Sequence, residues 1–334
     1  MKMEKIKTVH FGLAHDHSTA TLECARKYPD IFEIVGIVEP DEETKRIFGN
    51  HPAYQGLPYM TEEELFNRGD IEAVFCEGHE LRSVSDAQKC ADHGLHIHLD
   101  KPGGIDLNAF EKLLCDAQRK DLTLQMGYMY RYNPAMEYTL ARVKKGELGL
   151  ITGIDGSFSI CHNSTKRAWL GQFPGGMMFY IGCHVIDMIL LLMGAPENVI
   201  PYNRSSDWDN NGSMDSSFAV LDYPRGVCSV RVNATEVNGY NRRHLIVCGT
   251  EGTIEIRPLE CPTLLRETLA ADVKNNFSAD NSREIFTGYM PGRYDRMMLE
   301  FAACIRGEKQ NPYTAEYELL LQKVILQTCG IEII

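Results

Sequence analysis

The first 125 residues of the chain alternate between short apolar segments and segments that carry helix signals. Residues 8–11, 33–38 and 73–76 are apolar runs of strand length, and each is followed by residues typical of a helix. A further strand ends at Leu99, and a helix and then a strand at 123–126 follow it. Units of this kind, repeated in this order, predict a parallel sheet with helices on both faces.

The pattern changes after about residue 150, where strands dominate. Residues 179–193 are predicted as a buried helix, and residues 295–306 and 315–329 as two closing helices. The predicted strands of this part are residues 151–160, 217–223, 227–234, 244–247 and 253–256. Turn residues separate neighbouring strands, as in hairpins. We therefore expect an α+β domain with a mostly antiparallel sheet, and we divide the chain into residues 1–125 and 126–334.

Length and charge limit the classes of function. The 334 residues allow about two domains, and the net charge of −12 disfavours nonspecific binding to nucleic acid or to an anionic membrane. The sequence has no apolar run of the ~18 residues that a membrane-spanning helix needs, and its first residues lack the apolar region of a secretory signal. The 11 cysteines are scattered and form no C-x-x-C pair, which is typical of a reducing cytoplasm. We expect a cytoplasmic protein without nucleic-acid or membrane partners.

The turn after the first strand carries part of a dinucleotide-binding fingerprint. Gly12 takes the first glycine position of G-x-G-x-x-G, Ala14 the second and His17 the third. By itself this pattern fits an ordinary strand-to-helix turn equally well. Glu39, at the end of the second strand, favours a nucleotide, because an acid there accepts hydrogen bonds from ribose hydroxyls and repels a 2′-phosphate. The expected cofactor is therefore NAD, with NADP disfavoured.

Lys101 and His184 are the main catalytic candidates. Lys101 follows the strand that ends at Leu99, and a lysine at the carboxyl end of a strand in an open α/β sheet points into the crevice where such folds bind ligands. His184 lies in an apolar helix, and Tyr180 lies one helical turn before it on the same face. Lysine and histidine perform acid/base work when a site tunes their pKa values. The alternative for Lys101 is a solvated lysine at a strand end, and the alternative for His184 and Tyr180 is packing in the core.

Three further segments carry a resemblance to a known family. Asp100-Lys101-Pro102 is similar to an E-K-P motif, and residues 127–134 are similar to a G-F-x-x-R-x-x-P segment. Residues 175–187 are similar to a segment of the form G-G-x-x-x-D-x-G-x-H-x-x-D. With these motifs in this order, nearly the whole chain resembles the Gfo/Idh/MocA oxidoreductases, the family of glucose–fructose oxidoreductase and inositol dehydrogenase. Tyr180 stands where the family has an acid, so the chain resembles a divergent subgroup.

The resemblance implies a fold and an activity. It implies a Rossmann domain, followed by a domain whose open sheet serves oligomerisation, and so a homo-dimer or homo-tetramer. It also implies a bound nicotinamide cofactor and a sugar, cyclitol or related polyol as substrate. In the family, the residue matching Lys101 contacts the substrate hydroxyl and the nicotinamide ribose, and the residue matching His184 transfers a proton.

The expected site residues follow from these assignments. Arg131 is expected to bind a substrate hydroxyl or carboxylate, Trp169 to stack on a sugar ring, and Asp187 to contact the substrate. The structural alternatives are that Arg131 pairs with an acid and that Trp169 packs in the core. The catalytic residues are expected to be Lys101, His184 and Tyr180. The expected cofactor contacts are Gly12, Ala14, His15, Asp16, His17, Glu39, Glu77, Gly78, Glu80, Lys101 and Pro102.

Histidines and acids near the predicted strand ends also invite a metal interpretation. They are His15, His17, Glu77, His79, Glu80, His96, His98 and Asp100. Their spacing matches no standard metal site, and His96 and His98 share one face of a strand beside the core. The sequence therefore predicts no metal.

Two other activities are compatible with the same residues. One is a glycosidase that holds NAD, oxidises a sugar transiently, eliminates a substituent and reduces the sugar back. The other is a non-catalytic regulator that binds a nucleotide, for which the incomplete glycine pattern leaves room.

Overall fold

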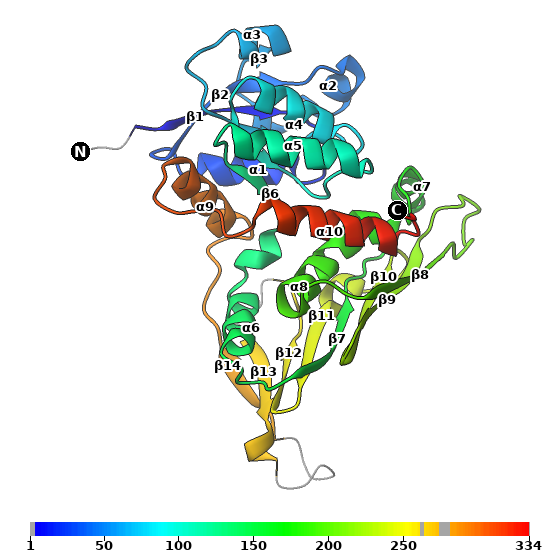
Figure 1. Cartoon of the computed structure of the whole chain (residues 1–334). Helices are drawn as coiled ribbons and strands as arrows, with labels where there is room; N and C mark the ends of the chain where they lie inside the picture. Colours follow the sequence, from blue (N-terminus) through cyan, green and yellow to red (C-terminus); the bar gives the residue numbers. More distant parts are fainter. Residues whose placement is uncertain (1–3, 261–263, 274–280, 334) are drawn as a thin grey trace. The chain divides into compact units, whose positions relative to one another are not determined.

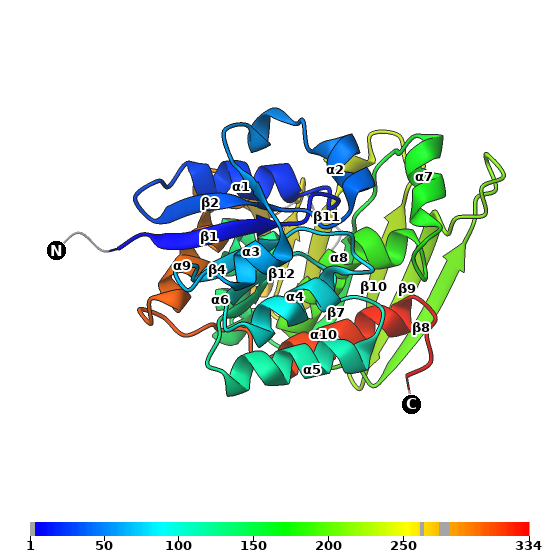
Figure 2. The same ribbon diagram turned by 90° about the horizontal axis from the view of Figure 1, so that it is seen from above.

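The computed structural model describes residues 4–260, 264–273 and 281–333. Across these residues the strands form two separate sheets, one of six and one of eight strands. Figure 1 labels the helices and strands, and Figure 2 shows the same ribbon turned by 90°. No helix within the described ranges is long and apolar enough to cross a membrane.

The chain folds as two units, each with its own sheet. The first unit contains residues 1–129 and 292–322, and the second contains residues 130–291 and 323–334. The division expected from the sequence assigned all of residues 126–334 to the second domain. In the structure, residues 292–322 group with the first unit instead.

The sheet of the first unit is parallel, with the strand order β3-β2-β1-β4-β5-β6. This is the order of doubly wound dinucleotide-binding sheets, in which the connections leave in opposite directions on the two sides of β1. The predicted Rossmann-type sheet is therefore confirmed. Its strands are β1 Ile6–Phe11, β2 Phe32–Val38, β3 Tyr59–Met60, β4 Ala73–Cys76, β5 His96–Leu99 and β6 Leu124–Met126.

Helices cover both faces of this sheet, as the alternating pattern predicted. Figures 1 and 2 show α4 and α5 side by side on one face and α1 on the other. Local signals define the ends of these helices: the Asp41 carboxylate accepts a hydrogen bond from the Thr44 N–H at the start of α2, and Thr61 and Glu64 form a capping box at α3. The helices are α1 Ser18–Arg26, α2 Glu42–Phe48, α3 Glu62–Phe66, α4 Ser83–Asp92 and α5 Leu107–Arg119.

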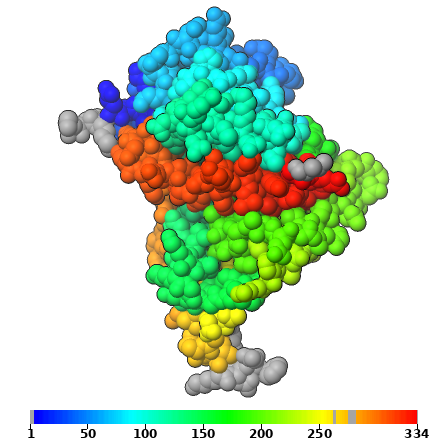
Figure 3. Space-filling view, viewed as in Figure 1, coloured from blue at the N-terminus to red at the C-terminus, as the bar shows by residue number. Residues whose placement is uncertain are grey.

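Helix α9, Asp295–Ile305, explains why the unit boundary differs from the expected one. Its apolar face is buried in the first unit, where the Phe301 ring lies 6.3 Å from the Phe75 ring and 5.9 Å from the His98 ring. Tyr28 donates a hydrogen bond of 2.6 Å to Asp295. Figure 3 shows the orange surface of α9 lying against the blue and cyan surface of this unit. A sequence pattern fixes the buried face of a helix but not the sheet that covers it.

The sheet of the second unit has the order β14-β13-β12-β11-β7-β10-β9-β8. The β7–β10 pair is parallel and the other pairs are antiparallel, which confirms the predicted mostly antiparallel sheet. The exposed side chains of Phe218 and Val227 leave apolar surface on this sheet. The strands are β7 Ile151–Ser157, β8 Asn198–Arg204, β9 Ser216–Tyr223, β10 Gly226–Asn233, β11 His244–Gly249, β12 Gly252–Ile256, β13 Leu264–Leu269 and β14 Arg283–Phe286.

Helix α8, Cys183–Met193, is the central helix of the second unit and is preceded by a π-helical turn, Met178–Gly182. It packs closely on β7, because a Cβ placed on Gly156 would lie 2.2 Å from the Val185 side chain. The single α-helix predicted over 179–193 is thus a π turn followed by an α-helix. Such π turns are rare and occur frequently at functional sites. The other helices are α6 Pro134–Lys144, α7 Ser164–Leu170 and α10 Ala315–Thr328. The division of the chain into units falls after Gln322, within the residue range of α10.

Candidate functional site

The turns after β1 and β4 are in backbone contact at the point where the strand order reverses. Gly12 has a φ of +90°, and a Cβ at this position would lie 2.4 Å from the Gly78 Cα. Only glycine fits both the dihedral angle and the contact. The His15 N–H donates to the Glu77 carbonyl at 3.0 Å, which fastens the two turns together. Ligands of open α/β sheets bind in the crevice at this switch point.

Glu39 follows β2 and is 6% exposed. Its carboxylate accepts hydrogen bonds from the Leu13 N–H at 2.8 Å and from the Asp41 N–H at 3.0 Å. Burial raises the pKa of this carboxyl, and the two N–H donors oppose the rise. A carboxylate has about four acceptor positions, so about two remain for further donors such as ribose hydroxyls. The Arg82 guanidinium lies 3.8 Å from Glu39, a neighbour that the sequence analysis missed.

His15, His17 and Asp100 form a buried group beside these turns. Asp100 Oδ2 lies 3.2 Å from His15 Nδ1 and 2.9 Å from His17 Nδ1. Burial by itself would raise the pKa of Asp100, but the two imidazoles outweigh it and hold that pKa well below its usual range. Burial lowers the pKa of His17 to about 4, against the attraction of Asp100. All three residues are candidates in the sequence, but no spacing in it indicates that they meet.

Two more carboxylates lie against this group. Glu77 and Glu80 are 0% and 1% exposed, and each lies 3.6 Å from a ring nitrogen of His15. Burial, and then the charge of Asp100, raise the pKa of Glu77 well above its ordinary value. His98 Nε2 lies 3.9 Å from Glu77, and burial lowers the pKa of His98. The crevice is therefore acidic in composition and shielded from water.

Lys101 lies in a fixed loop at the end of β5 and is 2% exposed. Its N–H donates to the Asp100 carboxylate at 2.7 Å, and its carbonyl lies 3.1 Å from His15 Nε2. The following Gly103 N–H donates to the Gln322 side chain at 2.8 Å. Gln322 comes from the far end of the chain, so no local signal pointed to this contact.

The remaining expected cofactor contacts lie on the same turns. Gly78 and Pro102 are part of the loops just described, and Pro102 is buried. Ala14 is half-buried, and Asp16 is exposed to solvent. The structure therefore brings these residues to one edge of the sheet, whereas their contacts with a cofactor stay predictions.

His184 lies in an aromatic and charged environment of the second unit. It is 3% exposed, and its ring lies 5.0 Å from the Tyr130 ring and 5.6 Å from the Phe158 ring. Tyr130 donates a hydrogen bond to Glu260, which also pairs with Arg243. The Arg243 guanidinium lies 3.8 Å from the centre of the Phe158 ring. Glu260 and Arg243 gave no signal in the sequence, because each lies far from His184 along the chain.

Tyr180 lies in the π turn and belongs to a second aromatic group. Its ring lies 5.2 Å from the Trp169 ring and 6.3 Å from the Phe173 ring. The Lys166 ammonium lies 3.5 Å from the centre of the Trp169 ring and 4.6 Å from that of Tyr180. The structure thus brings Trp169 and Tyr180 together, and their ring partners differ from those of His184. The shared face expected for Tyr180 and His184 assumed a regular α-helix, which the π turn interrupts.

Arg131 and Asp187 form a buried ion pair. The guanidinium donates to both carboxylate oxygens, with Nε at 2.9 and 3.0 Å and Nη2 at 2.9 Å. They are 2% and 0% exposed. Asp187 lies one turn after His184 on α8, so the pair fixes this helix to the segment that carries Arg131. Of the two interpretations given for Arg131, the structure contains the pairing with an acid; contact with a substrate stays a prediction for both residues.

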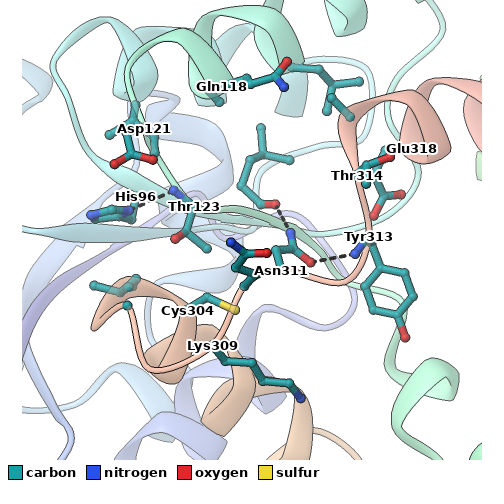
Figure 4. Close-up of a pocket in the computed structure, with 18 of the residues that line it drawn as sticks. His96, Gln118, Asp121, Thr123, Cys304, Lys309, Asn311, Tyr313, Thr314 and Glu318 are labelled. Carbon is teal, nitrogen blue, oxygen red and sulfur yellow. Dashed lines mark hydrogen bonds between the residues drawn. The ribbon is translucent and has the colours of Figure 1, made fainter.

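The first unit also has a cavity at the opposite end of its strands, of about 770 Å³. Figure 4 shows it between β5, β6 and the segment after α9, with His96, Asp121, Cys304 and Lys309 in its lining. Asn311 donates to the Leu124 carbonyl at 2.9 Å. His96 begins β5, whereas Lys101 follows the end of that strand, so this cavity is separate from the crevice. His96 is correspondingly remote from the group formed by His15 and Asp100.

Comparison with known proteins relates part of the chain to a known family. Residues 138–255 match the GFO/IDH/MocA C-terminal domain. The chain is 25% identical over 329 residues to an uncharacterized oxidoreductase, ORF334, of Rhizobium meliloti, covering 95% of each protein. It is 23% identical to a trans-1,2-dihydrobenzene-1,2-diol dehydrogenase of Xenopus tropicalis, covering 67% of each. A levoglucosan dehydrogenase solved with NADH and levoglucosan has the same fold, with a TM-score of 0.78, 19% identity and 98% of each chain covered.

The Arg131–Asp187 pair predicts a large loss of stability when one partner is removed. Asp187→Ala leaves the buried guanidinium without its carboxylate, and we expect it to lower the free energy of unfolding by about 3–5 kcal/mol. Urea unfolding followed by circular dichroism measures this loss. The double variant Arg131→Met/Asp187→Leu should recover most of it, because apolar side chains replace the buried charges. Arg46→Ala, which breaks an exposed pair with Glu43, is the control and should change little. An Asp187→Ala protein as stable as the native one would contradict this role.

Proposed function

Because residues 138–255 match the GFO/IDH/MocA C-terminal domain, we propose that the chain is an oxidoreductase of this family, an NAD(H)-dependent dehydrogenase or reductase that acts on a CH–OH carbon of a sugar, cyclitol or related polyol. The observation that carries the proposal is the switch point of the first sheet, where Gly12 and Gly78 are in backbone contact beside Glu39. The levoglucosan dehydrogenase of the same fold, solved with NADH and a sugar derivative, supports the substrate class.

The residues at the switch point fit a dinucleotide. Glu39 has acceptor positions left for ribose hydroxyls. Gly12 lets the turn after β1 lie directly against Gly78, where a larger side chain would not fit, as in the tight first turn of a dinucleotide-binding sheet. Lys101 and Pro102 follow β5 at the same edge of the sheet. When bound, the nicotinamide ring supplies the hydride chemistry, and the protein supplies orientation and proton transfer.

The residues of the chain then have distinct proposed roles. The Lys101 ammonium donates a hydrogen bond to the reacting oxygen and stabilises its alkoxide character. His184 takes the hydroxyl proton in oxidation and returns it in reduction. Tyr180 holds a substrate hydroxyl or relays a proton, since a phenol hydroxyl both donates and accepts hydrogen bonds. Arg131, Trp169 and Asp187 complete the proposed substrate contacts.

The proposal includes a cytoplasmic homo-dimer or homo-tetramer. Exposed apolar side chains on the second sheet, among them Phe218 and Val227, supply surface for a second copy of the chain. The scattered, free cysteines of the described residues fit a reducing compartment.

The first prediction from the proposed function concerns the choice of nucleotide. We expect calorimetric titration to show binding of NAD(H) in preference to NADP(H), because the Glu39 carboxylate repels a 2′-phosphate. Glu39→Ser should reduce this preference, and it leaves Arg82 nearby to favour the phosphate. Glu33→Ser, at an exposed position of β2, the strand that Glu39 follows, is the matched control. Equal affinities of the native protein for both cofactors would contradict the role of Glu39, and no binding of any of the four nucleotides would contradict the proposed function.

The second prediction concerns Lys101. We expect Lys101→Ala to keep its fold and to lose turnover by ~10²–10³-fold, the usual effect of removing a preorganised donor to a developing oxyanion. The assay screens sugars and cyclitols by NADH absorbance and compares kcat on the best substrate of that panel. Lys112→Ala, at an exposed position of α5, is the control and should keep the native rate. A Lys101→Ala enzyme with undiminished kcat would show that this ammonium is not catalytic.

The third prediction separates His184 from Tyr180. His184→Asn should lower kcat by ~10²-fold or more and remove the pH dependence of the rate near neutrality, because the imidazole is the proposed acid/base group. Tyr180→Phe should lower kcat less and keep that pH dependence, because only a hydroxyl contact is lost. The pH–rate profiles of the three proteins decide between them. If Tyr180→Phe is the more damaging change, the two roles are exchanged.

A further inference from the structure

The group formed by His15, His17 and Asp100 has the dimensions of a metal site. One ligand atom of each residue lies within 4.8 Å of the others. Asp100 Oδ2 lies 3.2 Å from His15 Nδ1 and 2.9 Å from His17 Nδ1, and Glu77 Oε2 lies 3.6 Å from His15 Nδ1. Ligand atoms at about 2.0 Å from a tetrahedral metal are roughly 3.3 Å apart. These separations suit ligand atoms arranged around one ion, with Asp100 next to both imidazoles and Glu77 next to His15.

The hydrogen bonds of His15 fix which of its nitrogens is available. Nε2 lies 3.1 Å from the Lys101 carbonyl, which only accepts, so the proton is on Nε2. Nδ1 faces the His17 N–H at 3.1 Å, which only donates, so in the neutral ring Nδ1 carries the lone pair, and a metal ion would take the place of that N–H. A histidine that donates one ring N–H to a backbone carbonyl and offers the other nitrogen is the usual arrangement of a metal ligand.

The carboxylates around the group lack the donors that buried acids require. Glu77 and Glu80 are 0% and 1% exposed. Neither oxygen of either side chain accepts a hydrogen bond from the described part of the chain. The charged form of such a buried acid carries a free-energy penalty, which a bound cation would lower. These acids are a second observation, independent of the distances, that points to a positive ion in this position.

We propose that His15, His17 and Asp100 bind one divalent transition-metal ion, with Glu77 as the fourth ligand. Two imidazoles and two carboxylates suit Zn²⁺ or a neighbouring first-row ion, whereas Mg²⁺ and Ca²⁺ prefer oxygen ligands alone. The ion joins the turn after β1 to the loops after β4 and β5, and so fixes the loop that carries Lys101. The inference goes beyond the proposed hydride transfer and does not depend on it.

Metal titration of the full chain tests the site directly. The protein is treated with a chelator, exchanged into metal-free buffer and titrated with Zn²⁺ by calorimetry, with Mg²⁺ in a parallel titration. We expect one Zn²⁺ per chain, at least ~10-fold tighter than Mg²⁺. Co²⁺ as a probe should give visible bands without a thiolate charge-transfer band, which distinguishes this site from the cysteines. Absence of stoichiometric Zn²⁺ binding, or a spectrum dominated by thiolate ligands, overturns the proposal.

Two matched histidine variants locate the ion. His17 has a side chain that is 15% exposed, so His17→Ala is the ligand change least disruptive to packing. It should weaken Zn²⁺ binding by ~10-fold or more. His93→Ala, at an exposed position after α4, should bind as the native protein does. Zn²⁺ should raise the melting temperature of the native and His93→Ala proteins and not that of His17→Ala. Native affinity in His17→Ala would overturn the assignment; should that variant fail to fold, His15→Gln is titrated under the same test.

Discussion

The backbone contact between Gly12 and Gly78 is the constraint on which the crevice of the first unit depends. It requires a residue without a Cβ at the first position, because the two turns approach to a distance that a methyl group would block. Through this contact the segments after β1 and β4 run together, and the His15 N–H reaches the Glu77 carbonyl. The loop after β5 adds Asp100 and Lys101. Side chains that are far apart in the sequence thereby share one buried region.

That region combines features of two kinds of ligand site. Its edge beside Glu39 has free acceptor positions and a bare backbone, which suit the ribose and pyrophosphate of a nucleotide. Its interior holds three buried acids, Glu77, Glu80 and Asp100, and each of them opposes an anion when it is ionised. A cation held among them would reduce this opposition, so the two proposals are electrostatically compatible.

The second unit is organised around α8, which packs on β7 where Gly156 leaves room for Val185. The Arg131–Asp187 pair fixes this helix one turn beyond His184. The position of α8 is therefore determined by Gly156 on β7 and by the Arg131–Asp187 ion pair. The π turn that precedes it places Tyr180 among other aromatic rings, with Trp169 and Phe173.

Periodicity and turn residues determined much of the fold in advance. The alternation of strands and helices before residue 125 predicted the parallel sheet, and the run of strands after residue 150 predicted the antiparallel one. Strand β4 was predicted with the bounds Ala73–Cys76 that the structure has. The short or irregular elements β3, β8, β13 and β14 were missed, because they are too brief or too polar for a pattern to form.

The contacts between segments that are distant in the sequence were decided only by the tertiary structure. The sequence named His15, His17, Asp100 and Glu77 but gave no spacing that would join them, because three separate loops contribute them. Likewise, nothing local indicated that α9 completes the first unit. A side-chain pattern records which face of an element is buried, and the strand order of the sheet decides what that face meets. The sequence by itself therefore determined the elements and the candidate residues, and the order of the strands determined which of them share a site.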